Sequence, residues 1–451
     1  MPPSTVMQVR ALAIVAALFG LGCVSGAGSP NDGAGGGTST GNGGSGNGGS
    51  GNGTAGASGA SGAGGAKGAG GAGAGGALGT GGSGGAVVGT GGAGGAMMGT
   101  GGRGAGGSAS GAGGAPGTGG SNAGGSSGGG VVGEPIGFAT LNGGTTGGRA
   151  GQTVTASTYA QLKMYAESAT PYVILVQGTI SNGANGGQIN VKSDKSIVGV
   201  GPTGFLFGVG LNISSANNII IQNLRLSMTG VTTRTDTAGV YSSTGDEGLP
   251  QILVNGGDAI GIQGTSKNIW IDHCELFSED PAVQTNIDLY DGLIDTKAQT
   301  GFITISWNYF HDHHKVGLVG ASDTDLFADR KITYHHNYYR NTKLRMPLYR
   351  GAVGHFFNNY LVGATDASEI RAGTCVRVEK NYYEALHFSI YTPTDSLGMT
   401  ERIDNIEVSR TARAYPANCV ADIPYPYSTA LTGTTTDVKA VVPAGAGVGK
   451  L

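Results

Sequence analysis

Three aspartates have the spacing of a cation site. Asp291 and Asp295 stand four apart in the run Asp-Gly-Leu-Ile-Asp, and Asp258 opens an Asp-Ala-Ile run earlier in the 451-residue chain. If the chain coils so that Asp258 lies one turn before this pair, the three carboxylates converge. Converging carboxylates favour a hard cation with oxygen ligands, most naturally Ca²⁺. From spacing alone, the alternative is three solvated loop aspartates.

A basic set follows the aspartates. Lys315 ends the run His-Asp-His-His-Lys, and Arg345 and Arg350 are the two ends of the run Arg-Met-Pro-Leu-Tyr-Arg. Taken alone, such residues are commonly surface charges or partners for nearby aspartates. The formal net charge is only −3, so a charged ligand must be bound locally. We expect a monomer without a nucleic-acid partner.

The histidines before Lys315 suggest a second candidate metal. His311, His313 and His314 are close enough in sequence to suggest Zn²⁺. In a regular strand, however, His311 and His313 would share one face and His314 would lie on the other. We therefore expect Ca²⁺ rather than Zn²⁺.

Six short strand-like runs must position these side chains. Their starts are separated by 50, 34, 29, 22 and 22 residues. A shortest unit of 22 residues, lengthened elsewhere by insertions, is typical of an all-β, single-stranded parallel β-helix. Loops should therefore crowd one side of the coil between the first and fourth runs. The runs are 219–224, 269–274, 303–308, 332–337, 354–359 and 376–381.

Four of these runs end at an asparagine, namely Asn308, Asn337, Asn359 and Asn381. Asparagine tolerates the left-handed conformation that a sharp corner needs, and stacked amides can hydrogen-bond along a coil. A β-sandwich with regular strand spacing is the alternative, but it offers no reason for a constant corner residue.

The chain before the runs has a different composition. Residues 24–133 hold 53 of the 91 glycines, which favours a disordered linker over residues 23–133. Residues 1–22 have the short apolar core of a signal peptide, and Cys23 then matches a bacterial lipoprotein site. Ordinary cleavage after Ala27 is the alternative. Either way we expect an exported protein, secreted or tethered to the outer cell surface, with one catalytic domain over residues 134–451.

The other cysteines agree with export. Cys274 lies in an apolar run and is expected to be a buried free thiol. Cys375 and Cys419 either form a disulfide or stay free.

At this point the sequence resembles a known family. An ordered set of motifs, together with a closing run at residues 445–451, is similar to the polysaccharide lyase family 1 pectate lyases over roughly residues 137–451. The resemblance implies a right-handed parallel β-helix. The motifs lie at 270–273, 291–295, 303–310, 313–315, 333–337, 345–350 and 358–360.

The resemblance also implies roles for the singled-out residues. Asp258, Asp291 and Asp295 would bind the Ca²⁺ that bridges to a uronate carboxylate. Arg345 would be the catalytic base that removes the C5 proton, and Lys315 and Arg350 would hold the substrate carboxylate. His273, in a family signature, would only support them. The family usually has aspartate where His314 stands, which leaves the orientation of Lys315 open.

The implied reaction is β-elimination on polygalacturonate, which gives a 4,5-unsaturated sugar end. Cations would neutralise the carboxylate beside C5 and stabilise the intermediate. Crowding by Ca²⁺, Lys315 and Arg350 would lower the pKa of Arg345, so activity should rise into alkaline pH. Three rivals remain: a pectin lyase acting on methyl-esterified chains, a hydrolytic polygalacturonase, and a non-catalytic surface pectin-binding protein.

Overall fold

The computed structural model describes residues 130–237, 239–409, 411 and 415–451. The predicted signal peptide, Cys23 and the predicted linker up to residue 129 lie outside these residues. Within the described part, no helix is long and apolar enough to cross a membrane.

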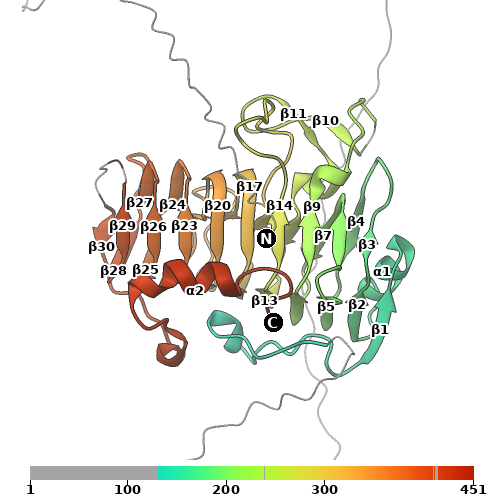
Figure 1. Ribbon diagram of the computed structural model, residues 1–451, viewed down its shortest axis with the longest axis horizontal. Helices are drawn as coiled ribbons and strands as arrows, with labels where there is room; N and C mark the ends of the chain where they lie inside the picture. The colour runs from blue at the N-terminus through green and yellow to red at the C-terminus, as the bar shows by residue number, and fades with distance from the viewer. Residues whose placement is uncertain (1–129, 238, 410, 412–414) are drawn as a thin grey trace, which may run out of the picture. The chain divides into compact units, whose positions relative to one another are not determined.

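One parallel sheet contains all six runs found in the sequence. Their first residues stand opposite one another, as in the pairs Ile219–Ile269, Ile269–Ile303 and Ile303–Ile332. Each run is therefore the same segment of successive turns, stacked in register (Figure 1). The eleven strands of the sheet, in spatial order, are β1 (Gln152–Ala156), β2 (Tyr172–Val176), β5 (Lys195–Gly199), β8 (Ile219–Gln222), β13 (Lys267–Asp272), β16 (Gly301–Ser306), β19 (Ile332–His335), β22 (Val353–Phe357), β25 (Cys375–Glu379), β28 (Met399–Ile403) and β30 (Ala417–Asn418).

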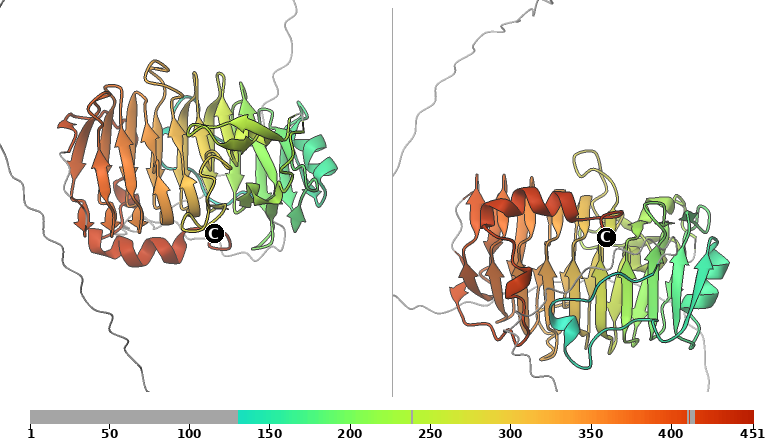
Figure 2. Two further views of the ribbon diagram at one scale, coloured as in Figure 1. Left: turned by 90° about the horizontal axis from the view of Figure 1, so that it is seen from above. Right: turned by 60° about the horizontal axis from the view of Figure 1, so that its bottom comes forward.

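Two further parallel ladders complete each turn, and they join through the pairing of β20 with β24. The predicted all-β parallel β-helix is thereby confirmed (Figure 2). The first ladder is β3 (Thr179–Ile180), β6 (Phe205–Phe207), β9 (Arg225–Ser227), β14 (Glu275–Phe277), β17 (Tyr309–Lys315), β20 (Tyr338–Leu344), β23 (Tyr360–Val362), β26 (Tyr382–Glu384) and β29 (Ile406–Val408). The second is β4 (Gly187–Asn190), β7 (Val209–Ser214), β12 (Ile260–Gln263), β15 (Ile294–Thr296), β18 (Leu318–Val319), β21 (Leu348–Tyr349), β24 (Asp366–Ile370) and β27 (Phe388–Tyr391).

The interior of the coil is apolar and continuous along its length. Ile219, Ile269, Ile303 and Ile332, one from each successive turn, are all fully buried. Such stacked aliphatic side chains stabilise every turn through its two neighbours, because a single turn cannot bury its own apolar face.

A ladder of asparagine amides follows one corner of the coil. The Nδ2 of Asn308 donates to the Oδ1 of Asn337 over 3.1 Å, and the pattern continues through Asn359 and Asn381 to Asn405 at 3.0, 2.9 and 3.1 Å. The predicted hydrogen bonding along the coil is confirmed. The sequence indicated only four of these five asparagines.

The left-handed residue of that corner is not the asparagine itself. It is the residue before it, such as Trp307 with φ 52°, His336 with φ 54° and Lys380 with φ 50°. The prediction that the asparagine takes this conformation is wrong. The amide is needed instead for hydrogen bonds between turns, and the preceding residue makes the bend.

Two helices and a hairpin lie outside the coil. Helix α1 (Tyr159–Ala166) lies beside the first turns, and α2 (Val438–Gly445) lies along the later turns (Figure 1). Val438 and Val442 of α2 pack against Tyr360. The antiparallel hairpin of β10 (Tyr241–Thr244) and β11 (Pro250–Ile252) belongs to the insertions predicted between the first and fourth runs. Short 3-10 segments are η1 (Phe138–Thr140), η2 (Met228–Gly230), η3 (Val254–Gly257), η4 (Ser428–Ala430) and η5 (Thr435–Asp437).

The structure shows the pairing of the described cysteines and the isomer of one proline peptide bond. Cys375 and Cys419 form a disulfide across 44 residues, which resolves the alternative left open by the sequence. Cys274 is a buried free thiol, as predicted. The peptide bond between Met346 and Pro347 is cis.

The asparagine ladder should be a major source of stability. Replacing Asn337, which is fully buried, with alanine removes the acceptor for two donors of Asn308 and the donor to Asn359. We expect Asn337→Ala to lower the free energy of unfolding by about 2–4 kcal/mol. The matched control is Asn405→Ala at the half-buried end of the ladder, which should cost less. Equal losses in thermal unfolding would contradict the role of the buried ladder.

A buried histidine should make stability depend on pH. His336 packs against Trp307 at 4.2 Å between ring centroids, and burial, with a smaller effect of His273, lowers its pKa to about 3. Between about pH 6.5 and 3 the unfolded chain binds a proton that the folded chain does not, so the free energy of unfolding falls as pH falls, by at most about 1.4 kcal/mol per pH unit. In His336→Asn, which suits the left-handed backbone, this fall should be shallower when melting temperatures are compared from pH 7 to 4. If the melting temperatures of the two proteins fell equally with pH, His336 would not be a source of the pH dependence.

Candidate active site

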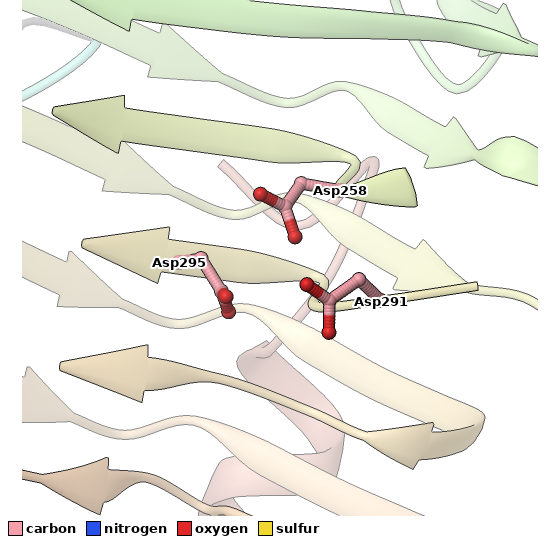
Figure 3. Close-up of side chains that lie close together, drawn as sticks. All are labelled: Asp258, Asp291 and Asp295. Carbon is pink, nitrogen blue, oxygen red and sulfur yellow. The ribbon is translucent and has the colours of Figure 1, made fainter. Parts of the chain in front are cut away.

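The coil brings the three predicted aspartates together. Asp258 directly follows η3 and precedes β12, and Asp295 lies in β15. The strands β12 and β15 are adjacent, with Gly261 opposite Asp295. Asp291 precedes β15 on the same turn. Ligand oxygens of the three side chains all lie within 4.8 Å of one another, and Figure 3 shows the carboxylates turned toward a common space.

Two glycines keep that space open. A Cβ on Gly292 would lie 1.9 Å from Oδ1 of Asp295 and 3.2 Å from Oδ1 of Asp258. At Gly257, with φ 86°, a Cβ would lie 2.9 Å from the backbone nitrogen of Asp291. A side chain at Gly292 would therefore collide with the carboxylate of Asp295, and one at Gly257 would collide with the backbone of Asp291.

The proximity of the carboxylates disfavours their charged forms. Burial raises the pKa of Asp258 well above its ordinary value, and Asp295 raises it further. Burial also raises the pKa of Asp291, to about 6, again with a contribution from Asp295. Three close like charges, two of them buried, need a counter-charge, which a cation bound among them would supply.

Lys315 and Arg345 adjoin the aspartates and share a partner. The Oδ2 of Asp246, in the turn between β10 and β11, lies 3.4 Å from Nζ of Lys315 and 2.8 Å from a guanidinium nitrogen of Arg345. Lys315 is buried and also pairs with the fully buried Asp288 at 2.6 Å. These two aspartates orient Lys315, so its position does not depend on an aspartate at residue 314.

The acidic environment works against the predicted behaviour of Arg345. Burial alone would lower its pKa, but the hydrogen bond to Asp246 and the charges of Asp295 and Asp291 raise it above the ordinary value. Without a bound cation, the expected depression of this pKa is absent, because carboxylates rather than cations surround the guanidinium.

Arg350 lies at the other end of β21 from Arg345. Its Nε donates to Asp323 and one terminal nitrogen donates to the carbonyl of Gly320 at 3.0 Å. Asp323 also pairs with Arg371 at 3.3 Å. The structure therefore brings Lys315 and Arg345 to one carboxylate and places Arg350 on a different one.

The histidine run does not form a shared metal site. Asp312 has φ 46°, which breaks the alternation of β17. His311 therefore pairs with Glu275 and Asp312 on the outer side, whereas His313 is buried against Ser278. The predicted common face of His311 and His313 is wrong for this reason. Among the described residues, the aspartate cluster is the one group of three or more acidic, histidine or cysteine side chains with metal-binding geometry.

A family model described as pectate lyase matches residues 130–451. The chain belongs to the pectate lyase family. It is therefore a polysaccharide lyase, and the resemblance found in its motifs is confirmed.

Individual relatives agree with this assignment. A pectate trisaccharide-lyase of Bacillus licheniformis is 38% identical over 322 residues, covering 70% of this chain and 86% of that protein. Pectate lyase A of Aspergillus niger is 33% identical over 315 residues, covering 69% and 87%. The crystal structure of a pectate lyase from Bacillus sp. N165 in complex with trigalacturonate is 32% identical, with a TM-score of 0.57, covering 70% of this chain and 99% of that one.

The sequence did not reveal three residues of this candidate site. Lys297 contacts the aspartates at 3.2 and 3.7 Å, and its spacing of two from Asp295 on a strand was an available signal. Asp246 and Asp288 come from insertions, and nothing in their spacing indicated that they meet Lys315.

The site has a formal charge deficit that suits a divalent cation. The aspartate cluster with Lys297 carries a net charge of −2 when all four side chains are ionised, and the second group, Asp246 and Asp288 with Lys315 and Arg345, is neutral. The donor atoms are all carboxylate oxygens, the preferred ligands of hard cations. The set is Asp246, Asp258, Asp288, Asp291, Asp295, Lys297, Lys315 and Arg345.

Proposed function

We propose that this protein is a calcium-dependent pectate lyase that cleaves α-1,4-linked polygalacturonate by β-elimination and leaves 4,5-unsaturated oligogalacturonides. The observation that carries the proposal is the convergence of Asp258, Asp291 and Asp295 beside Lys315 and Arg345. A relative named as a pectate trisaccharide-lyase and a similar structure with bound trigalacturonate support the substrate class.

The residues present fit Ca²⁺. Asp258, Asp291 and Asp295 would hold the ion, in the space that the missing side chain of Gly292 leaves open. Oδ2 of Asp295 is buried, and its cationic neighbour is Nζ of Lys297 at 3.2 Å. When bound, Ca²⁺ would neutralise the uronate carboxylate and so make the C5 proton more acidic.

The basic side chains would carry out the remaining steps. Lys315 would hold the uronate carboxylate beside C5, and Arg350 would bind the substrate once it exchanges Asp323 for a uronate. Arg345, in its deprotonated form, would accept the C5 proton, and the C4 glycosidic oxygen would then leave with the bonding electron pair. Because Arg345 must lose a proton first, turnover should rise with pH.

The proposal includes the location of the enzyme. The apolar segment before Cys23 supports export, and lipidation of Cys23 would attach residues 134–451 to the outer cell surface through a glycine-rich tether. An enzyme held in this way would act on polysaccharide outside the cell.

The decisive experiment follows the ultraviolet absorbance of the unsaturated product. The wild-type protein should produce it from polygalacturonate, faster at alkaline pH, and excess chelator should abolish it until Ca²⁺ is restored. Arg345→Lys should lose at least about 100-fold in turnover and still bind polygalacturonate.

Each rival has its own outcome in that assay. Faster reaction on methyl-esterified pectin, without chelator sensitivity, indicates a pectin lyase. New reducing ends without absorbance indicate hydrolysis. Binding without either product indicates a non-catalytic pectin-binding protein.

The open space at Gly292 gives a second prediction. In Gly292→Ala the added methyl group would collide with Oδ1 of Asp295, so the carboxylates would have to move apart. We expect Ca²⁺ affinity, measured by calorimetry, to fall at least about tenfold, with turnover falling in parallel at limiting Ca²⁺. A folded variant with wild-type Ca²⁺ affinity would show that the ion binds elsewhere.

A further inference from the structure

A lysine ammonium lies within the aspartate cluster. Nζ of Lys297 is 3.2 Å from Oδ2 of Asp295 and 3.7 Å from Oδ2 of Asp258. Lys297 directly follows β15, so its backbone is held by the same strand that carries Asp295.

We propose that Lys297 is a built-in competitor of Ca²⁺: its ammonium neutralises Asp258 and Asp295 before the ion binds and must be displaced from the same oxygen atoms when the ion arrives. Lys297 would thereby set the Ca²⁺ affinity below the value that the three carboxylates alone would give. The inference rests on the calcium site of the proposed function.

The hydrogen bonds of the aspartates identify the contested atoms. Oδ1 of Asp258 accepts from the backbone nitrogen of Gly292 at 2.9 Å, and Oδ1 of Asp295 accepts from that of Leu318 at 3.0 Å. Both Oδ1 atoms are therefore engaged by the backbone. Each Oδ1 keeps a second lone pair for a cation, but it is the two Oδ2 atoms that face Lys297.

The Lys297 ammonium has space beside it into which it can move. The Lys297 side chain is 32% exposed, unlike the two aspartates that it contacts. It lines a cavity of about 190 Å³ together with the polar side chains of Gln188, Asn212 and Gln263. A lysine has four rotatable side-chain bonds, so its ammonium can move into this cavity without moving β15.

The test is the Ca²⁺ affinity of Lys297→Met, which keeps the apolar stem and removes the charge. Titration of the full chain with calcium chloride in a calorimeter, without substrate, should show at least about tenfold tighter binding than in the wild type. Lys267→Met is the matched control, because Lys267 pairs with Asp329 and not with the cluster, and it should bind Ca²⁺ as the wild type does.

A second variant covers the case in which loss of the lysine harms folding. Lys297→Arg keeps the positive charge and should bind Ca²⁺ no more tightly than the wild type, with thermal melting reported for every protein. If Lys297→Met melts earlier, its affinity is measured below its melting transition, where tighter binding still supports the proposal.

The outcomes separate this inference from the proposed function. Equal or weaker Ca²⁺ binding by Lys297→Met overturns the competitor role and leaves the calcium site intact. No Ca²⁺ binding by any of these proteins overturns the calcium site and the inference together. Tighter binding by Lys297→Met, with a wild-type protein that makes no unsaturated product, supports the inference and contradicts the lyase reaction.

Discussion

In-register parallel stacking is the constraint on which the whole structure depends. Because each turn lies directly on the previous one, residues at equivalent positions become neighbours at about one strand spacing, however many residues separate them in the chain. The buried isoleucine column and the asparagine ladder are two results of this rule, and a third is the approach of Asp258 to the 291–295 segment of the next turn. The insertion between β9 and β12 changes the length of a turn and leaves the register intact.

The same stacking makes the active site possible at an electrostatic cost. Asp258 and Asp295 are both nearly inaccessible to solvent, an arrangement that isolated loops would not maintain. The hydrogen-bonded ladders of the coil hold them in place, and backbone nitrogens of Gly292 and Leu318 fix one oxygen of each. The rigid scaffold thus maintains an electrostatically unfavourable cluster of carboxylates.

Much of the fold could be predicted because its repeat is visible in the sequence. The six runs begin at residues that pair in the structure, and the asparagine column was indicated by four of its members. The bend was assigned to the wrong residue, since asparagine tolerates φ > 0 but is used here for its amide. His313 was placed on the wrong face because a left-handed Asp312 breaks the alternation of β17, which depends on packing rather than on composition.

The sequence by itself determined the repeating turn, the family and the candidate site residues: three aspartates, a lysine and two arginines in a fixed order. Only the tertiary structure decided which charges face one another. Lys297 lies against the aspartates, Asp246 joins Lys315 to Arg345, and Arg350 pairs with Asp323. The reason is physical: strand spacing is repeated along the chain and can be read from it, whereas charge pairing depends on how insertions of unequal length fold back over the coil.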